Sequence, residues 1–222
     1  MTYPDVPGRV PAGATPEGDG IVVGDGPVRV DAFIDFLCPY CRQFELSSEH
    51  ALAGLISGGL ASIAYHPMNF LDQASTTNYS TRAAAASGCA ADQGRFLDFA
   101  HVLFTHQPPE GGPGLSDAEL AGLGRAAGLA DAPFTDCQSE APYLDWPAYV
   151  TERATAAGVT ATPTVLVAGA MVQADGPTIV RAVQRAAREQ LRAWPQRASR
   201  TWPRGRPGST RASRNRGIPR SG

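Results

Sequence analysis

Residues 33–44 read Phe33-Ile34-Asp35-Phe36-Leu37-Cys38-Pro39-Tyr40-Cys41-Arg42-Gln43-Phe44. An apolar run ends here in two cysteines separated by two residues, and the spacing of the apolar residues then becomes helical. At the first turn of a helix, this spacing brings two sulfurs close enough for a disulfide that closes a very small ring. Pro39 suits that turn, because its fixed φ is helical and its missing N–H would have had no partner there. The stretch therefore predicts a redox-active dithiol where a strand passes into a helix.

The two cysteines are predicted to have different roles. Cys38 is expected at the helix N-terminus, where unpaired backbone N–H groups and the helix dipole favour negative charge. This position predicts a lowered pKa and an exposed, attacking Cys38 thiolate. Cys41 lies one turn further along and is expected to be the buried thiol that resolves a mixed disulfide.

A zinc knuckle and an inert pair of thiols are the alternatives for this Cys-x-x-Cys. Zinc usually requires a second Cys or His pair at similarly tight spacing. Cys89 and Cys137 are far apart in the chain, and the four histidines share no ligand spacing. The redox site is therefore favoured, and no metal is expected.

The chain of 222 residues is long enough for one large domain or two small ones. Every apolar run is interrupted before it reaches the length of a membrane span. The N-terminus shows no basic region followed by an apolar stretch, so no secretory signal is visible. As written, the chain is expected in the cytoplasm, and an extracytoplasmic location is expected if its start is truncated.

The net charge of −2 conceals two oppositely charged parts. All 21 acidic residues lie at or before Glu189, whereas 8 of the 19 basic residues, all arginines, lie in residues 193–222. That stretch has few apolar residues, so residues 193–222 are expected to be a disordered tail. An arm that binds nucleic acid or anionic lipid and a shifted reading frame are alternatives. No nucleic-acid partner is expected, because Trp194 and Trp202 are the only aromatic residues among these arginines.

The order of predicted elements indicates an α/β fold with an insertion. Residues 1–20 are rich in Pro and Gly and are expected to form a flexible lead-in. Strands are predicted at residues 21–23, 28–36 and 60–65, with a helix to about Ser57 between the last two. Residues 75–158 predict only helices, and a β-hairpin at 164–172 and a helix to 191 follow. We therefore expect one domain from residues 21–74 and 159–192, interrupted by a helical insertion at 75–158.

These features resemble the DsbA-like thiol:disulfide oxidoreductases of the thioredoxin superfamily, in their actinobacterial form, over about residues 20–191. The resemblance depends on the Cys38-Pro-Tyr-Cys41 motif after a strand, on the helical insertion, and on Thr162-Pro163 before the hairpin. It implies a thioredoxin fold with a helical domain inserted between the βαβ and ββα halves. It also implies a cis Pro163 that faces the cysteines and, with Thr162, docks an extended substrate. Pro39 and Tyr40 are expected to contribute to substrate binding.

The resemblance has consequences for three further positions. It implies a structural disulfide between Cys89 and Cys137, worth on the order of 4 kcal/mol, and two buried free thiols are the alternative. Tyr40 stands where the most oxidising members of the family carry His, so a less extreme reduction potential is expected. Asp35 is the nearest candidate for an acid beside the cysteines, and an exposed charge at a strand end is an equally open interpretation.

The sequence thus predicts a monomeric enzyme that exchanges disulfides with protein substrates and needs no metal or organic cofactor. A redox partner that recycles the Cys38–Cys41 pair is implied. One alternative is a glutaredoxin-like thioltransferase that uses a low-molecular-weight thiol, suggested by Pro39-Tyr40. Another is a non-catalytic thioredoxin-fold binding module. The direction of electron flow, and hence an oxidase, reductase or isomerase role, is left open by the sequence.

Overall fold

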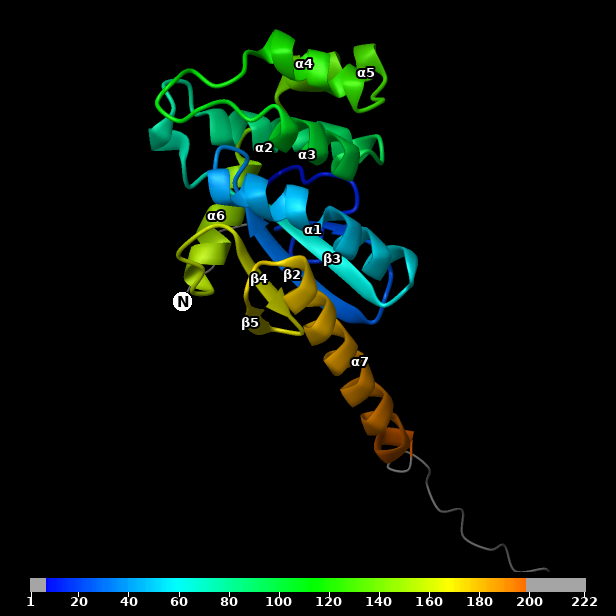
Figure 1. Cartoon of the computed structure of the whole chain (residues 1–222). Helices are drawn as coiled ribbons and strands as arrows, with labels where there is room; N and C mark the ends of the chain where they lie inside the picture. Colours follow the sequence, from blue (N-terminus) through cyan, green and yellow to red (C-terminus); the bar gives the residue numbers. More distant parts are fainter. Residues whose placement is uncertain (1–6, 199–222) are drawn as a thin grey trace, which may run out of the picture.

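A computed structural model of the chain describes residues 7–198 (Figure 1). Its centre is a five-stranded sheet with the order β1-β3-β2-β4-β5. Strands β2 and β3 are parallel, and all other neighbours are antiparallel. The strands span Ile21–Val23 (β1), Val28–Ile34 (β2), Ala61–Pro67 (β3), Thr164–Val167 (β4) and Ala170–Val172 (β5). This mixed α/β arrangement confirms the predicted fold class.

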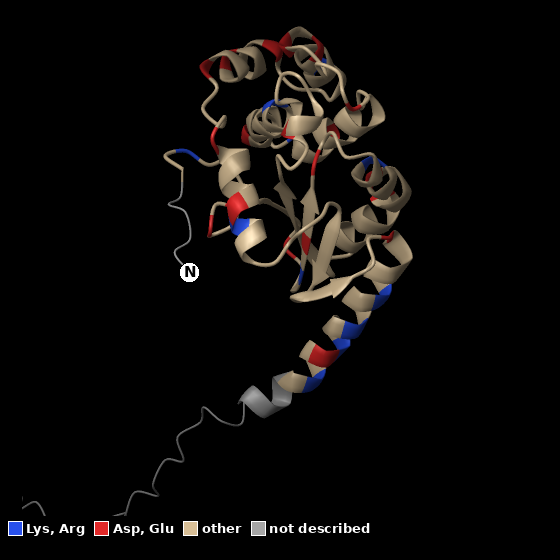
Figure 2. Ribbon diagram, turned by 90° about the vertical axis from the view of Figure 1, so that its left-hand side faces the viewer, with Lys and Arg blue, Asp and Glu red and all other residues tan. Residues whose placement is uncertain are grey.

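Helices cover both faces of the sheet (Figure 2). Helices α1 (Pro39–Ser57) and α7 (Gly176–Ala198) pack side by side, and α7 also contacts β2 and β4. A short 3-10 helix and five α-helices lie between β3 and β4 in the chain: η1 (Asp72–Ala74), α2 (Tyr79–Asp92), α3 (Phe96–Thr105), α4 (Asp117–Ala126), α5 (Asp131–Glu140) and α6 (Trp146–Ala156). Helices α2 and α3 lie next to α1, and α4 and α5 lie beyond them (Figure 1). Helix α6 packs against β3.

Strand β2 is the central strand and carries the active-site stretch at its end. Val30 pairs with Ile63 on one side and with Val167 on the other. Because helices cover both faces of the sheet, Phe33 is buried as well as Ile34, although the two side chains point to opposite faces. The strand ends at Ile34, two residues before the predicted end, because the Asp35 side chain accepts a hydrogen bond from the Leu37 N–H and turns the chain.

The prediction that residues 1–20 form a flexible lead-in is wrong for the second half of this segment. The indole N–H of Trp146 donates to the carbonyl oxygen of Gly18 over 2.8 Å, and the Tyr149 hydroxyl donates to that of Glu17 over 2.6 Å. Thr15 is buried, and Ala14 forms a β-bridge with Ile21. These contacts with α6 and β1 hold residues 14–20 against the body, which repeated Pro and Gly in the sequence did not indicate.

The predicted start of the C-terminal tail is also corrected. Helix α7 continues to Ala198, six residues past Arg192, because each residue added to an existing helix gains a hydrogen bond without a new nucleation cost. The arginines of the described part of α7 line the segment that extends away from the body (Figure 2). The remaining residues of the expected tail, 199–222, lie outside the described part of the chain. No helix within residues 7–198 is long and apolar enough to cross a membrane.

Candidate active site

The Cys-x-x-Cys motif begins helix α1. Cys38 is the N-cap residue, with an extended backbone at φ −71° and ψ 120°, and Pro39 is the first helical residue. The Cys38 N–H donates to the carbonyl oxygen of Asp35 over 3.1 Å, and the Cys38 carbonyl accepts from the Arg42 N–H over 3.1 Å. The Cys38 sulfur therefore lies at the positive end of the helix dipole, where negative charge is stabilised.

The fold brings Thr162 and Pro163 to this helix end from far along the chain. In its protonated form, the Cys38 thiol donates a hydrogen bond to the Thr162 carbonyl oxygen, with Sγ and O 3.3 Å apart across 124 residues of sequence. The Thr162–Pro163 peptide bond is cis. Pro163 directly precedes β4, the neighbour of β2 in the sheet, and this places the loop before β4 beside the end of β2.

Cys38 is less exposed than the sequence predicts. The residue is only 4 % exposed, because the chain around Thr162 covers it. It lines a cavity of about 410 Å³ together with Tyr40, Phe70, Leu71 and residues 160–162. Tyr40 is 70 % exposed at this cavity, so Pro39 and Tyr40 stand where a ligand would enter. The prediction of an exposed Cys38 is therefore wrong, and the residue instead lines the wall of a cavity.

The two thiols have opposite pKa shifts. The pKa of Cys38 is lowered to about 6, chiefly by a hydrogen bond from the Cys41 thiol, with further hydrogen bonds from the Thr162 side chain and the backbone N–H groups of Cys41 and Tyr40. Burial raises the pKa of Cys41 well above its usual value, and the hydrogen bond to Cys38 and the charge on Cys38 raise it further. At neutral pH, Cys38 is therefore mainly a thiolate and Cys41 a thiol.

A pH profile of alkylation tests this difference. In the reduced protein, the rate at which iodoacetamide modifies Cys38 is expected to rise with pH and to reach half its plateau near pH 6, because the thiolate is the reacting form. The Cys41→Ala change should shift this midpoint to higher pH, since it removes the strongest stabilising hydrogen bond. A wild-type midpoint above about pH 8, near that of a free cysteine, would contradict the interpretation.

Asp35 is buried, so the interpretation as an exposed strand-end charge is wrong. Its Oδ1 accepts hydrogen bonds from the Leu37 N–H over 2.8 Å and the Ser80 hydroxyl over 2.7 Å, and its Oδ2 accepts one from the Leu71 N–H over 2.9 Å. Burial raises the pKa of Asp35 to about 6, although these hydrogen bonds act to lower it. The charge of Cys38 makes a smaller contribution that also raises it. The carboxylate thus joins the end of β2 to the segment after β3 and to α2.

The Asp35→Asn variant should reveal this positioning role. The side-chain NH2 group of Asn replaces one carboxylate oxygen and, at the Oδ2 position, faces the Leu71 N–H, so we expect a loss of about 2 kcal/mol in the free energy of unfolding at pH 7.5. The pKa of Cys38 should fall, because the variant removes a negative charge that interacts with the thiolate. Urea unfolding and thiolate absorbance measure the two effects, and Asp25→Asn, at an exposed turn, is the control. An unchanged Cys38 pKa would leave Asp35 with a structural role only.

Gln107 is a residue of the site that sequence reasoning missed. Its side-chain amide donates to the carbonyl oxygens of Phe36 and Cys38, both over 2.9 Å. From the other direction, the Arg42 guanidinium of α1 donates to the carbonyl of Phe104 near the end of α3. The helical insertion therefore holds the backbone on both sides of the cysteine, and a single Gln in a loop gives no sequence signal for this.

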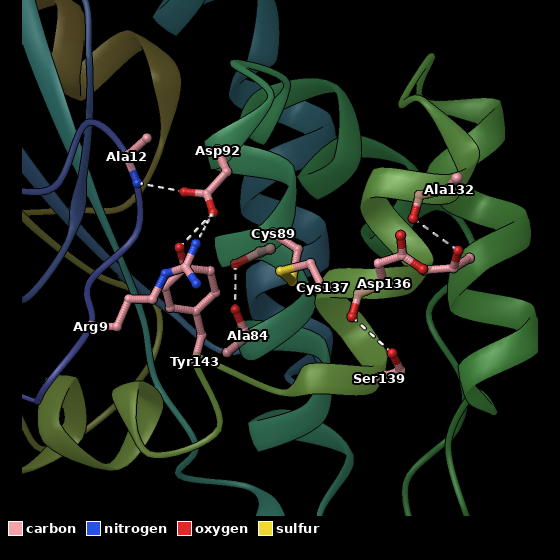
Figure 3. The surroundings of a disulfide bond; sticks show 12 residues. Arg9, Ala12, Ala84, Cys89, Asp92, Ala132, Asp136, Cys137, Ser139 and Tyr143 are labelled. Atoms are coloured by element: carbon pink, nitrogen blue, oxygen red, sulfur yellow. Dashed lines mark hydrogen bonds and ion pairs between the residues drawn. A yellow bond between two sulfur atoms is a disulfide. The ribbon is translucent and has the colours of Figure 1, made fainter.

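The other two cysteines form a disulfide between α2 and α5 (Figure 3). The sulfurs of Cys89 and Cys137 are 2.08 Å apart, so they are not the pair of free thiols considered as the alternative. Beside this bond, Asp92 accepts a hydrogen bond from the Tyr143 hydroxyl within the insertion, and one from the Ala12 N–H that links the insertion to the N-terminal segment (Figure 3). Within residues 7–198, no group of three or more His, Cys, Asp or Glu side chains is arranged to hold a metal ion.

Comparisons with known proteins agree with this geometry. Residues 17–185 match the family described as Thioredoxin. Reduced DsbA from Mycobacterium tuberculosis is 30 % identical, with a TM-score of 0.63 over 77 % of this chain and 98 % of that one. Reduced DsbG from the same organism is 34 % identical, with a TM-score of 0.62 over 70 % of this chain and 81 % of that one.

A curated relative extends the comparison to a longer protein. The serine/threonine-protein kinase PknE of Mycobacterium tuberculosis is 35 % identical over 132 residues, which is 55 % of this chain. The match spans only 23 % of the kinase's length. With a thioredoxin match over most of the chain and solved relatives matched over most of their own length, the chain belongs to the thioredoxin family, among its DsbA-like thiol:disulfide oxidoreductases.

Proposed function

We propose that this enzyme donates disulfides to protein substrates through the Cys38–Cys41 pair. A substrate thiolate attacks Cys38 Sγ, the bond between the two cysteine sulfurs breaks, and its electron pair leaves on Cys41, which takes up a proton. A second substrate thiolate then attacks the substrate sulfur of the mixed disulfide and releases the Cys38 thiolate. The substrate loses two electrons and the Cys38–Cys41 pair gains them.

The observation that supports this function best is the position of Cys38 between the start of α1 and Thr162. The sulfur lines the 410 Å³ cavity, and the Thr162 carbonyl lies 3.3 Å away. The backbone of residues 162 and 163, at the start of a strand, offers an extended substrate segment hydrogen-bonding groups of the kind found between strands. Tyr40 and Phe70 supply apolar surface for the substrate's side chains.

The low pKa of Cys38 supports the oxidising direction. A thiolate that is stable at neutral pH stabilises the reduced pair and is a good leaving group, and both effects favour transfer of the disulfide to the substrate. We expect a reduction potential clearly above the value of about −270 mV found for thioredoxin. Equilibration with glutathione buffers measures it, and a potential at or below that value would assign the chain to reduction instead.

Assays with different substrates distinguish the alternatives. Oxidative refolding of a reduced, disulfide-containing protein should be accelerated, whereas reduction of a small disulfide by glutathione should proceed slowly. Faster turnover with the small thiol than with the protein substrate would favour a glutaredoxin-like thioltransferase. The reaction also requires a partner that reoxidises the reduced pair, and this partner would accept electrons from the Cys38 thiolate.

We further propose that the enzyme acts as a monomer in an oxidising compartment. The Cys89–Cys137 disulfide supports this location, because such bonds persist mainly outside the reducing cytosol. Thiol labelling of the protein in intact cells, before lysis, tests the redox state of these two cysteines. Light scattering tests the oligomeric state, and a dimer would contradict the proposal.

A further inference from the structure

A second cavity, of about 420 Å³, lies between helix α1, strand β3 and helix α3. It does not include Cys38 or Thr162, so it is separate from the active site. Ionisable residues line it from α1, β3 and α3, whereas the end of α4 contributes only alanines. They are Glu45 and Glu49 of α1, Tyr65 of β3, Arg95 before α3, and Asp98 and His101 of α3.

Glu45 is the unusual member of this set. The residue is only 5 % exposed, and within residues 7–198 its Oε2 atom has no hydrogen-bond partner. Burying a carboxylate without a partner is costly, and most buried polar groups in proteins are hydrogen-bonded. The Glu45 side chain lines the cavity. If the Glu45 carboxylate turns toward the cavity, a cationic group there would supply the partner that is missing among the described residues.

The other charged groups around the cavity do not supply a partner for the Glu45 carboxylate. Asp98 is paired with Arg95 at 3.3 Å, and Glu49 lies 3.4 Å from the His101 ring. Burial and the negative charge of Glu49 together raise the pKa of Glu45 to about 7. Two carboxylates one helical turn apart thus face the same space, and a positive charge between them would favour the ionised form of Glu45.

The remaining walls of the cavity are apolar. Leu52 and Ile56 continue the same side of α1, and Val102 faces the cavity from α3. A hydrated metal ion would gain nothing from these walls, and within the described residues no three ligands are arranged for one. We propose that this cavity binds an alkylammonium group, with the ammonium at Glu45 and Glu49 and the alkyl chain against Leu52, Ile56 and Val102. This inference is independent of the proposed function.

Binding of two ammonium compounds tests the site. We expect n-butylammonium, Nα-acetyl-lysine methylamide or both to bind saturably, with a Kd on the order of 1 mM or below by calorimetry and by amide shifts in α1. The uncharged 1-butanol and the anionic butyrate should not bind. Glu45→Gln should weaken ammonium binding at least tenfold, whereas Glu152→Gln, at an exposed position of α6, should not change it.

The pH dependence provides a second readout. Because the ammonium compound requires ionised Glu45, its affinity should be about tenfold higher at pH 8 than at pH 6. This dependence on pH should disappear in Glu45→Gln.

The outcomes separate the sources of the ammonium group. Binding of n-butylammonium alone identifies a free amine as the ligand, and binding of the lysine compound identifies a lysine side chain of a polypeptide; both support the site. No saturable binding, equal binding of 1-butanol, or equal binding to Glu45→Gln would overturn it. Circular dichroism verifies that Glu45→Gln is folded. If it is not, Glu49→Gln serves as the test variant, and we expect it to weaken binding at least threefold.

Discussion

The Cys38→Ser variant is expected to lose disulfide exchange by at least about a thousandfold, because a serine hydroxyl is far weaker than a thiolate as a nucleophile at neutral pH and forms no disulfide. The loss should appear in oxidative refolding and in insulin reduction alike. Since Cys38 lies in the wall of a cavity and contributes only a small side chain there, the free energy of unfolding should change by less than about 1.5 kcal/mol.

The Cys41→Ser variant is the matched control for this prediction. Cys38 remains able to attack a substrate disulfide, but no second thiol is present to release the product. Mixed disulfides with substrate proteins should therefore accumulate and be visible on non-reducing gels. If Cys38→Ser retained more than a tenth of the wild-type exchange activity, the assignment of Cys38 as the nucleophile would be wrong.

Removal of the Cys89–Cys137 disulfide is expected to cost about 4 kcal/mol of unfolding free energy, the chain-entropy value for a loop of 48 residues. The bond joins α2 to α5 at the outer side of the insertion, and α5 has only one fully buried side chain, Phe134. Without the bond, α5 should therefore be the first helix to detach. Urea unfolding of a Cys89→Ala, Cys137→Ala double variant measures the loss.

The comparison is best made in proteins that carry Cys38→Ser and Cys41→Ser, so that the active-site pair does not change redox state during unfolding. Adding a reductant to the protein with the intact structural bond should reproduce the loss seen in the double variant. A change below about 1 kcal/mol would show that the bond does not restrain the unfolded chain as the loop-closure argument requires.

Local sequence was sufficient for the elements and for the chemistry of the motif. The switch from a strand pattern to a helical pattern at Cys38, with Pro39 at the first turn, predicts where α1 begins, and the structure places the start there. The helical insertion and the final hairpin could also be recognised, because their apolar periods and turn residues are properties of short segments. These features depend on residues within one or two turns of each other.

The surroundings of Cys38 could not be derived in the same way. The coverage of its sulfur by Thr162, the hydrogen bonds of Gln107 to the Cys38 backbone and the burial of Asp35 beneath α2 join segments from 36 to 124 residues apart. The exposure predicted for Cys38 was wrong for this reason, since helix position alone does not show what packs above it.

The amino-acid sequence by itself therefore determined the redox pair, its place at the start of a helix and the class of fold. Only the packed chain shows how far Cys38 is buried, which groups lower its pKa, and that within residues 7–198 the Glu45 Oε2 atom has no hydrogen-bond partner. The physical reason is that backbone periodicity and helix dipoles act over a few residues, whereas burial and hydrogen-bond partners depend on segments that only the packed chain brings together.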